Sequence, residues 1–169
     1  MGDFKPYQFT VEEGMFIERR QVLLDLKPED VFRAYTGIGG ERGWLYMDWS
    51  WAIRGWMDKA IGGVGLRRGR RHPDEIYTGE SLDFWRVESV EKNRLMRLRA
   101  EMKLPGKAWL QFESTPQGDK TLLTVTAYLA PYGVPGFLYW YAMWPFHKFI
   151  FDGLARQLAS RARVLAHSY

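Results

Sequence analysis

Apolar and polar residues alternate along three stretches between residues 96 and 129. Their apolar positions are Met96, Leu98, Ala100 and Met102; Ala108, Leu110 and Phe112; and Leu123, Val125, Ala127 and Leu129. Successive side chains of a strand point to opposite faces, so this period of two predicts strands with one apolar and one polar face. With a further strand over residues 81–90, the stretches predict a meander of at least four antiparallel strands.

Short segments rich in turn-forming residues separate these predicted strands. They are Glu91-Lys92-Asn93, Pro105-Gly106 and Pro116-Gln117-Gly118-Asp119. Proline followed by glycine is the preferred centre of a type II turn, so we expect a tight turn at Pro105-Gly106.

The N-terminal third predicts one strand and a short helix. Alternation predicts a strand over residues 15–26, and Pro28 then stands where a helix would begin. Proline lacks the N–H that has no partner in the first turn, and Glu29 and Asp30 complement the positive end of the helix dipole. Because a run of glycines begins at Gly37, we expect this helix to be short.

A second helix is predicted over residues 49–61, before Gly62-Gly63. Asp48 and Ser50 are both candidates for the N-terminal cap. The predicted apolar stripe consists of Ile53, Met57 and Ile61, and Arg54 and Asp58 have the spacing of an ion pair within a helix.

After Pro131 the pattern is helical to the end of the chain. One stripe is apolar and the opposite stripe is polar. The apolar stripe is Ile150, Leu154, Leu158, Ala162 and Leu165, and the polar stripe is Lys148, Asp152, Arg156, Ser160 and Arg163. Proline inside a helix removes a hydrogen bond, so a break or bend is expected at Pro145.

These elements together predict an α+β fold. A sheet with one apolar face must cover that face, and the long C-terminal helix is the largest element available. A curved antiparallel sheet wrapped around this helix leaves space at one end, with the two short helices as its lid. We expect a single domain over residues 1–169.

The composition adds an excess of aromatic side chains, with 10 Phe, 9 Tyr and 8 Trp. Such a set indicates either an aromatic-walled pocket or an aromatic core. The candidate pocket residues are Trp85, Met102, Tyr128, Tyr139 and Trp140. The run over residues 137–146 has too many rings for one helix face, so some of them must contact solvent, a ligand, a partner protein or a membrane interface.

Several classes of protein are disfavoured by the same composition. No cysteine is present, which excludes disulfides and thiolate chemistry. Residues 1–10 lack the apolar core of a signal peptide, and the apolar stretch 134–146 is shorter than the ~20 residues that cross a bilayer. We therefore expect a cytoplasmic protein without a membrane span, and a net charge of +4 does not by itself indicate nucleic acid.

Six short motifs resemble an uncharacterised bacterial family, domain of unknown function 2867. The resemblance covers roughly residues 32–159. The motifs are GGVGLRRGR at 62–70, DFWRV at 83–87, EMKLPG at 101–106, AWL at 108–110, YWY at 139–141 and PFH at 145–147.

This resemblance implies a helix-grip fold, like that of START lipid-binding domains and polyketide cyclases in the SRPBCC superfamily. It also implies that members often follow a nucleotide-binding domain of the short-chain dehydrogenase kind. No such domain is visible in this sequence, so a separate NAD(P)-binding protein is a possible partner. The family supplies no established catalytic residues.

Candidate sites for charged ligands and cofactors are few. The glycine run over residues 63–69 does not match a dinucleotide fingerprint, because its last glycine comes one residue late and a helix precedes it. No cofactor is therefore expected. Arg67 and Arg70 are the first choices for binding an anion, although a solvated loop paired with acidic neighbours is the simpler interpretation. The histidines are too few and too scattered for a metal site.

Asp83, Arg86 and His147 are the weak candidates for catalysis. Asp83 and Arg86 flank an apolar pair in a predicted core strand, so they either pair with Arg54 or Asp58 or provide polar groups inside a cavity. His147 lies among aromatic residues, without an identifiable partner for general-base catalysis.

Three hypotheses follow for function. The first is binding of a hydrophobic or amphipathic small molecule between the sheet and the long helix. The second is a cyclase-like or dehydratase-like enzyme, and the third is an interaction domain whose aromatic run docks on a separate redox protein.

Overall fold

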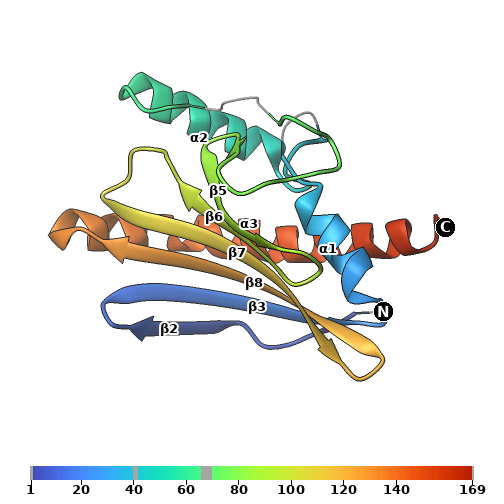
Figure 1. Ribbon diagram of the computed structural model, residues 1–169. Coiled ribbons are helices and arrows are strands. Elements are labelled where there is room, and N and C mark those ends of the chain that lie inside the picture. The colour runs from blue at the N-terminus through green and yellow to red at the C-terminus, as the bar shows by residue number, and fades with distance from the viewer. Residues whose placement is uncertain (1, 40–41, 66–69, 169) are drawn as a thin grey trace.

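The protein folds as an antiparallel sheet that curves around a long helix (Figure 1). The computed structural model describes residues 2–39, 42–65 and 70–168. In these ranges the strands are β1 Asp3–Phe4, β2 Gln8–Glu12, β3 Met15–Leu24, β4 Ser81–Leu82, β5 Trp85–Glu91, β6 Leu95–Ala100, β7 Gly106–Gln117 and β8 Lys120–Pro131. The helices are α1 Pro28–Thr36, α2 Asp48–Ala60 and α3 Gly133–Ala166.

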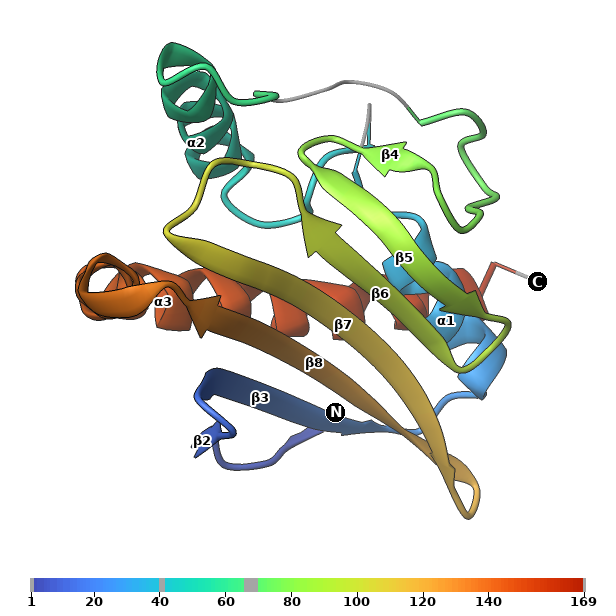
Figure 2. The same cartoon turned by 60° about the vertical axis from the view of Figure 1, so that its left-hand side comes forward.

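The predicted meander is confirmed, as β5, β6, β7 and β8 pair in order with antiparallel register. β3 pairs with β8, which places the first long strand beside the last one. The sheet is open, and Figure 2 shows its strands crossing the length of α3. This is the predicted α+β helix-grip architecture.

Two N-terminal strands were not predicted. β1 and β2 both pair with β3, and all of their residues are exposed. The predicted strand over residues 15–26 ends at Leu24, two residues early. Short exposed edge strands leave little trace in a sequence, because neither face is buried and no alternation is required.

α1 begins at Pro28 as predicted and packs against α3. The predictions for α2 were partly wrong. Met47, with φ of 51°, precedes its first residue Asp48, and no side chain caps this end. The stripe of Ile53, Met57 and Ile61 is exposed rather than packed on the core. The buried positions of α2 are instead Trp51, Gly55 and Asp58.

The tight turn predicted at Pro105-Gly106 is absent. β6 ends at Ala100 and Gly106 is already the first residue of β7, paired with Pro131. A side chain at Gly106 would collide with the backbone of Ala130, so this glycine permits a close strand contact instead of a turn.

α3 continues through Pro145 as one helix, so the first of the two expected outcomes, a break, does not occur. Its C-terminal half carries the predicted apolar stripe, of which Leu154, Leu158 and Ala162 are fully buried. These side chains meet residues of β3, β6, β7 and β8 in the main core. The small residues Ala155 and Ala159 are also buried on this half of the helix.

Replacing Leu158 with alanine tests the role of this packing. We expect Leu158→Ala to lower the free energy of unfolding by about 2–5 kcal/mol, because it removes buried methyl groups and leaves a void. Urea denaturation followed by circular dichroism measures the change. Val164→Ala on the exposed face of the same helix should change stability by less than about 0.5 kcal/mol. Equal effects of the two substitutions would contradict this account of the core.

Candidate functional site

A cavity of about 660 Å³ lies between α2, the first half of α3 and the strands β5, β7 and β8. α2 forms one wall, whereas no residue of α1 lines the cavity. The lid is therefore one helix rather than the two that were predicted. Trp51, Trp85, Ala127, Trp140 and Phe151 are buried around it, while Trp49, Ile53, Met57, Phe146 and Phe149 line it and are exposed. The exposed set marks the mouth.

The five candidate pocket residues come together in this cavity. Trp85, Met102, Tyr128, Tyr139 and Trp140 all line it, although they come from β5, the loop after β6, β8 and α3. Trp140 of α3 stacks on Phe16 of β3, with ring centroids 4.9 Å apart. Their part in ligand binding stays a prediction.

Among the described residues, Arg54 is the one charged side chain on the cavity wall when His147 is neutral, and this place in the cavity was not predicted from the sequence. It does not pair with Asp58. Its Nε donates to Met102 Sδ at 3.2 Å, and its guanidinium lies 5.2 Å from the ring centroid of Tyr139. Burial raises the pKa of Tyr139, and the positive charge of Arg54 opposes this increase. An uncompensated cation on an apolar wall favours a ligand with an anionic or carbonyl oxygen.

His147 is the only weak catalytic candidate that lines the cavity. Its ring lies between Trp140 and Phe151, with centroid distances of 6.2 and 5.5 Å. Burial, followed by the nearby positive charges of Arg54 and Arg20, lowers the pKa of His147 to about 4. The imidazole is therefore neutral at pH 7 and able to donate or accept one hydrogen bond.

Trp85 contributes a hydrogen-bond donor that the fold does not use. Its side chain is 4% exposed, and its indole Nε1 is buried without a hydrogen-bond partner in the described part of the chain. Buried polar groups are nearly always paired in proteins, so this N–H is a natural donor to a ligand oxygen.

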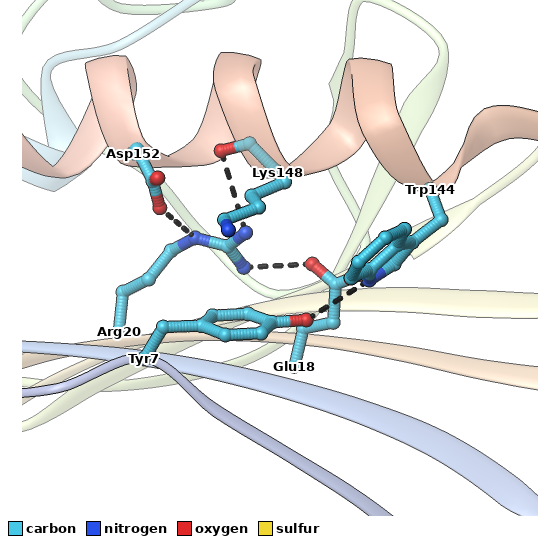
Figure 3. Close-up of polar contacts among 6 residues, drawn as sticks. All are labelled: Tyr7, Glu18, Arg20, Trp144, Lys148 and Asp152. Carbon is cyan, nitrogen blue, oxygen red and sulfur yellow. Dashed lines mark hydrogen bonds and ion pairs between the residues drawn. The ribbon is translucent and has the colours of Figure 1, made fainter.

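An ionic cluster joins β3 to the turn of α3 that carries Lys148 and Asp152 (Figure 3). Arg20 of β3 contacts Glu18 at 2.8 Å and Asp152 of α3 at 2.7 Å. Its guanidinium also lies 5.5 Å from the Phe151 centroid. Burial raises the pKa of Glu18, while the charge of Arg20 opposes the increase. This cluster joins sheet and helix beside the cavity.

Tyr7 and Trp144 pack beside the ionic cluster and contact each other. Trp144 Nε1 donates to the Tyr7 hydroxyl at 3.2 Å, and the Arg20 guanidinium lies 4.8 Å from the Tyr7 centroid (Figure 3). The N-terminal segment between β1 and β2 is thereby attached to α3.

Asp58 holds the lid helix in place. Its carboxylate accepts hydrogen bonds from the backbone N–H groups of Gly65 at 2.9 Å and Lys103 at 2.6 Å. These bonds connect α2 to the loop after β6, which carries Met102. The buried carboxylate of Asp58 thus ties α2 to two loops.

Asp83 and Arg86 do not line the cavity, and neither pairs with Arg54 or Asp58. Asp83 is buried with φ of 54° and accepts a hydrogen bond from Trp44 Nε1 at 2.7 Å. Arg86 pairs with Glu101 at 2.8 Å and donates to the carbonyl of Gly79. Both contacts hold structural elements together, so the geometry gives no support to a role of these two residues in a cavity reaction.

Arg70 also lies outside the cavity lining. Its guanidinium donates to the carbonyl oxygens of Ile38 at 2.8 Å and His72 at 2.7 Å, and burial lowers its pKa. Arg67 lies outside the described residues. Across the described ranges, no group of three or more His, Asp or Glu side chains has the arrangement of a metal site, and no helix has the length and hydropathy of a bilayer span.

Comparison with known proteins identifies a family for most of the chain. Residues 11–154 match the model of a family described as "Protein of unknown function (DUF2867)". The match begins earlier and ends slightly earlier than the resemblance over residues 32–159 indicated. No curated protein matches the chain.

Solved structures share the fold at low sequence identity. A protein from Arthrobacter aurescens has a TM-score of 0.57 at 10% identity, over 94% of this chain and 91% of its own. The di-domain ARO/CYC protein StfQ of the steffimycin biosynthetic pathway has a TM-score of 0.54 at 10% identity, over 90% of this chain and 52% of its own. DynU16 of the dynemicin biosynthetic locus has a TM-score of 0.51 at 19% identity, over 85% of this chain and 46% of its own. This chain thus spans about half of the latter two proteins.

The lowered pKa of His147 predicts a loss of stability in acid. Below pH 6.5 the unfolded chain binds a proton at this histidine while the folded state does not, until the pH approaches 4. Stability contributed by the neutral imidazole is present above pH 6.5 and should fall by about 2 kcal/mol between pH 7 and pH 5.

Urea denaturation of the wild type and of His147→Gln at both pH values measures this contribution. The raised pKa of Glu18 changes stability with pH in the opposite direction and does so in both proteins. The difference in unfolding free energy between the two proteins therefore isolates the contribution of the imidazole. The same pH dependence in both proteins would show that His147 is not held neutral by the fold.

Proposed function

Because this chain belongs to the DUF2867 family of proteins of unknown function, we propose a function from its cavity: the protein binds an amphipathic small molecule between the sheet and α3. The observation that carries the proposal is the cavity itself. Its volume of about 660 Å³ falls within the range of ligand pockets, roughly 300–1,000 Å³. The interior aromatic side chains leave this space rather than filling it.

The chemistry of the wall indicates the class of ligand. Most lining residues are aromatic or aliphatic, which suits a planar or chain-like hydrocarbon body. Arg54 supplies a cation and Trp85 supplies an unused N–H donor. A ligand with an apolar body and an acidic or carbonyl oxygen would satisfy both groups.

Binding is favoured over catalysis by the electrostatics of the wall. A general base works best with a pKa near the operating pH, whereas the pKa of His147 is about 4. No carboxylate lines the cavity in the described residues to form a pair with it. A cyclase-like or dehydratase-like activity remains the alternative, with His147 as the one catalytic candidate retained.

The comparisons support the fold of this proposal and leave its ligand open. StfQ and DynU16 belong to biosynthetic systems, and the likeness to them extends to the fold alone. Nothing in the comparisons favours an NAD(P)-binding partner.

Filling the cavity should abolish binding. We expect the wild type to bind the amphipathic anion anilinonaphthalene sulfonate, and Ala108→Trp to weaken the binding by at least about tenfold because the indole occupies the cavity. Fluorescence titration measures both dissociation constants. Ser160→Trp adds the same indole to an exposed position of α3 and should bind like the wild type. Unchanged binding by Ala108→Trp would reject the cavity as the site.

The charge of Arg54 should select anionic ligands. We expect Arg54→Gln to raise the dissociation constant of anilinonaphthalene sulfonate by about tenfold and that of the neutral probe aminoanthracene by less than about twofold. Arg54→Lys, which keeps the charge, should fall between the wild type and Arg54→Gln. Equal weakening for both probes would show that Arg54 shapes the cavity without recognising charge.

A further inference from the structure

The outward face of α2 is apolar. Trp49, Ile53, Trp56 and Met57 recur at helical spacing on this face, and Trp56 is 72% exposed. A surface helix normally directs its polar residues to solvent and its apolar residues to the core. Among the charged residues of α2, Asp48 and Lys59 at its two ends are exposed, Arg54 is half-buried and Asp58 is buried.

The first half of α3 has the same inverted pattern. Leu138, Tyr141 and Phe149 lie one helical turn or two apart, and they are 66%, 68% and 60% exposed. Continuing at the same spacing, this face becomes polar with Asp152, Arg156, Ser160 and Arg163. The exposed apolar face therefore ends where the helix passes the cavity.

The two apolar faces meet at the mouth of the cavity. Trp49 and Ile53 of α2, and Phe146 and Phe149 of α3, are exposed and also line the cavity. Trp56 shares the exposed apolar face of α2 with Trp49 and Ile53, and Leu138 and Tyr141 share that of α3 with Phe149, although none of the three lines the cavity. We call this surface the mouth rim; it consists of Trp49, Ile53, Trp56, Met57, Leu138, Tyr141, Phe146 and Phe149.

Basic residues accompany the mouth rim. Lys59, Lys103, Lys107 and Lys148 are exposed on the elements and loops that form the mouth. The two acidic residues of α2 accept hydrogen bonds from backbone N–H groups. Asp48 accepts from Trp44 at 2.5 Å, and Asp58 accepts from Gly65 and Lys103.

We propose that the mouth rim docks on the surface of an anionic lipid bilayer. Tryptophan, tyrosine and phenylalanine side chains insert at the boundary of headgroups and acyl chains, and flanking lysines contact lipid phosphates. A second copy of the chain is disfavoured, because pairing two mouth rims would bring lysines of like charge together. Docking requires no ligand in the cavity, so it goes beyond the proposed binding function.

Vesicle sedimentation tests the proposal. We expect the wild type to bind vesicles of phosphatidylcholine and phosphatidylserine in a three-to-one ratio, and to bind pure phosphatidylcholine vesicles at least about tenfold more weakly. The double variant Trp56→Ser with Leu138→Ser should lose at least about tenfold in partitioning. Neither residue lines the cavity, so binding of anilinonaphthalene sulfonate should remain.

Matched variants separate docking from general stickiness. Val164→Ser with Tyr77→Ser removes two exposed apolar residues outside the mouth rim and should bind vesicles like the wild type. Lys59→Gln with Lys107→Gln should weaken binding to the anionic vesicles by roughly tenfold, whereas Lys92→Gln with Lys120→Gln should not.

The outcomes for docking and for ligand binding are independent. Ala108→Trp should no longer bind anilinonaphthalene sulfonate but should bind vesicles like the wild type. Vesicle binding therefore tests the docking proposal even if the cavity proposal is wrong. Absence of wild-type vesicle binding, or equal binding by Trp56→Ser with Leu138→Ser, would overturn the lipid assignment. Analytical ultracentrifugation provides a further test. If the wild type is a dimer and the double variant Trp56→Ser with Leu138→Ser is a monomer, the lipid assignment is overturned and the mouth rim is an interface with a second copy.

Discussion

The burial of one face of α3 against the concave face of the sheet is the contact on which the other features of this protein depend. Leu154, Leu158 and Ala162 supply the buried stripe, and β3, β6, β7 and β8 supply its partners. α1 covers the same half of the helix, where Ala155 and Ala159 are small and buried. No residue of α1, and no residue of α3 after Phe151, lines the cavity.

The other half of α3 has large rings, and α2 reaches it through side-chain contacts such as Trp51 with Phe151 and Arg54 with Tyr139. Trp140 and Phe151 face inward, α2 is held across the space by Asp58, and the cavity lies between them. The cluster of Arg20, Glu18 and Asp152 joins sheet and helix at this point. Burying such charges costs free energy unless they are well paired, so the cluster defines position more than it adds stability.

The apolar wall of the cavity, the cation Arg54 and the lysines near the mouth all suit amphipathic anions. A molecule with a hydrocarbon body and an anionic group suits Arg54 and the rings around it. The same type of molecule partitions into bilayers, so a mouth that docks on lipid would place the cavity beside its source. The two proposals are nonetheless independent in their physical requirements, since one concerns interior volume and the other exposed surface.

The sequence by itself determined the meander, the C-terminal helix and the wrapping of one around the other. Period-two and helical patterns such as Leu123, Val125 and Ala127, or Leu154 and Leu158, report directly which face of an element is buried. It did not reveal β1 and β2, because exposed edge strands need no pattern.

Tertiary structure alone decided which elements face the cavity. Ile53 and Met57 form an apolar stripe that looks like a core contact, yet they lie at the mouth because Trp51, Gly55 and Asp58 are buried instead. For the same reason Arg54 could not be distinguished from a surface arginine, and Asp83 could not be recognised as the partner of Trp44. Contacts between residues distant in sequence depend on packing geometry, and local periodicity carries no record of it.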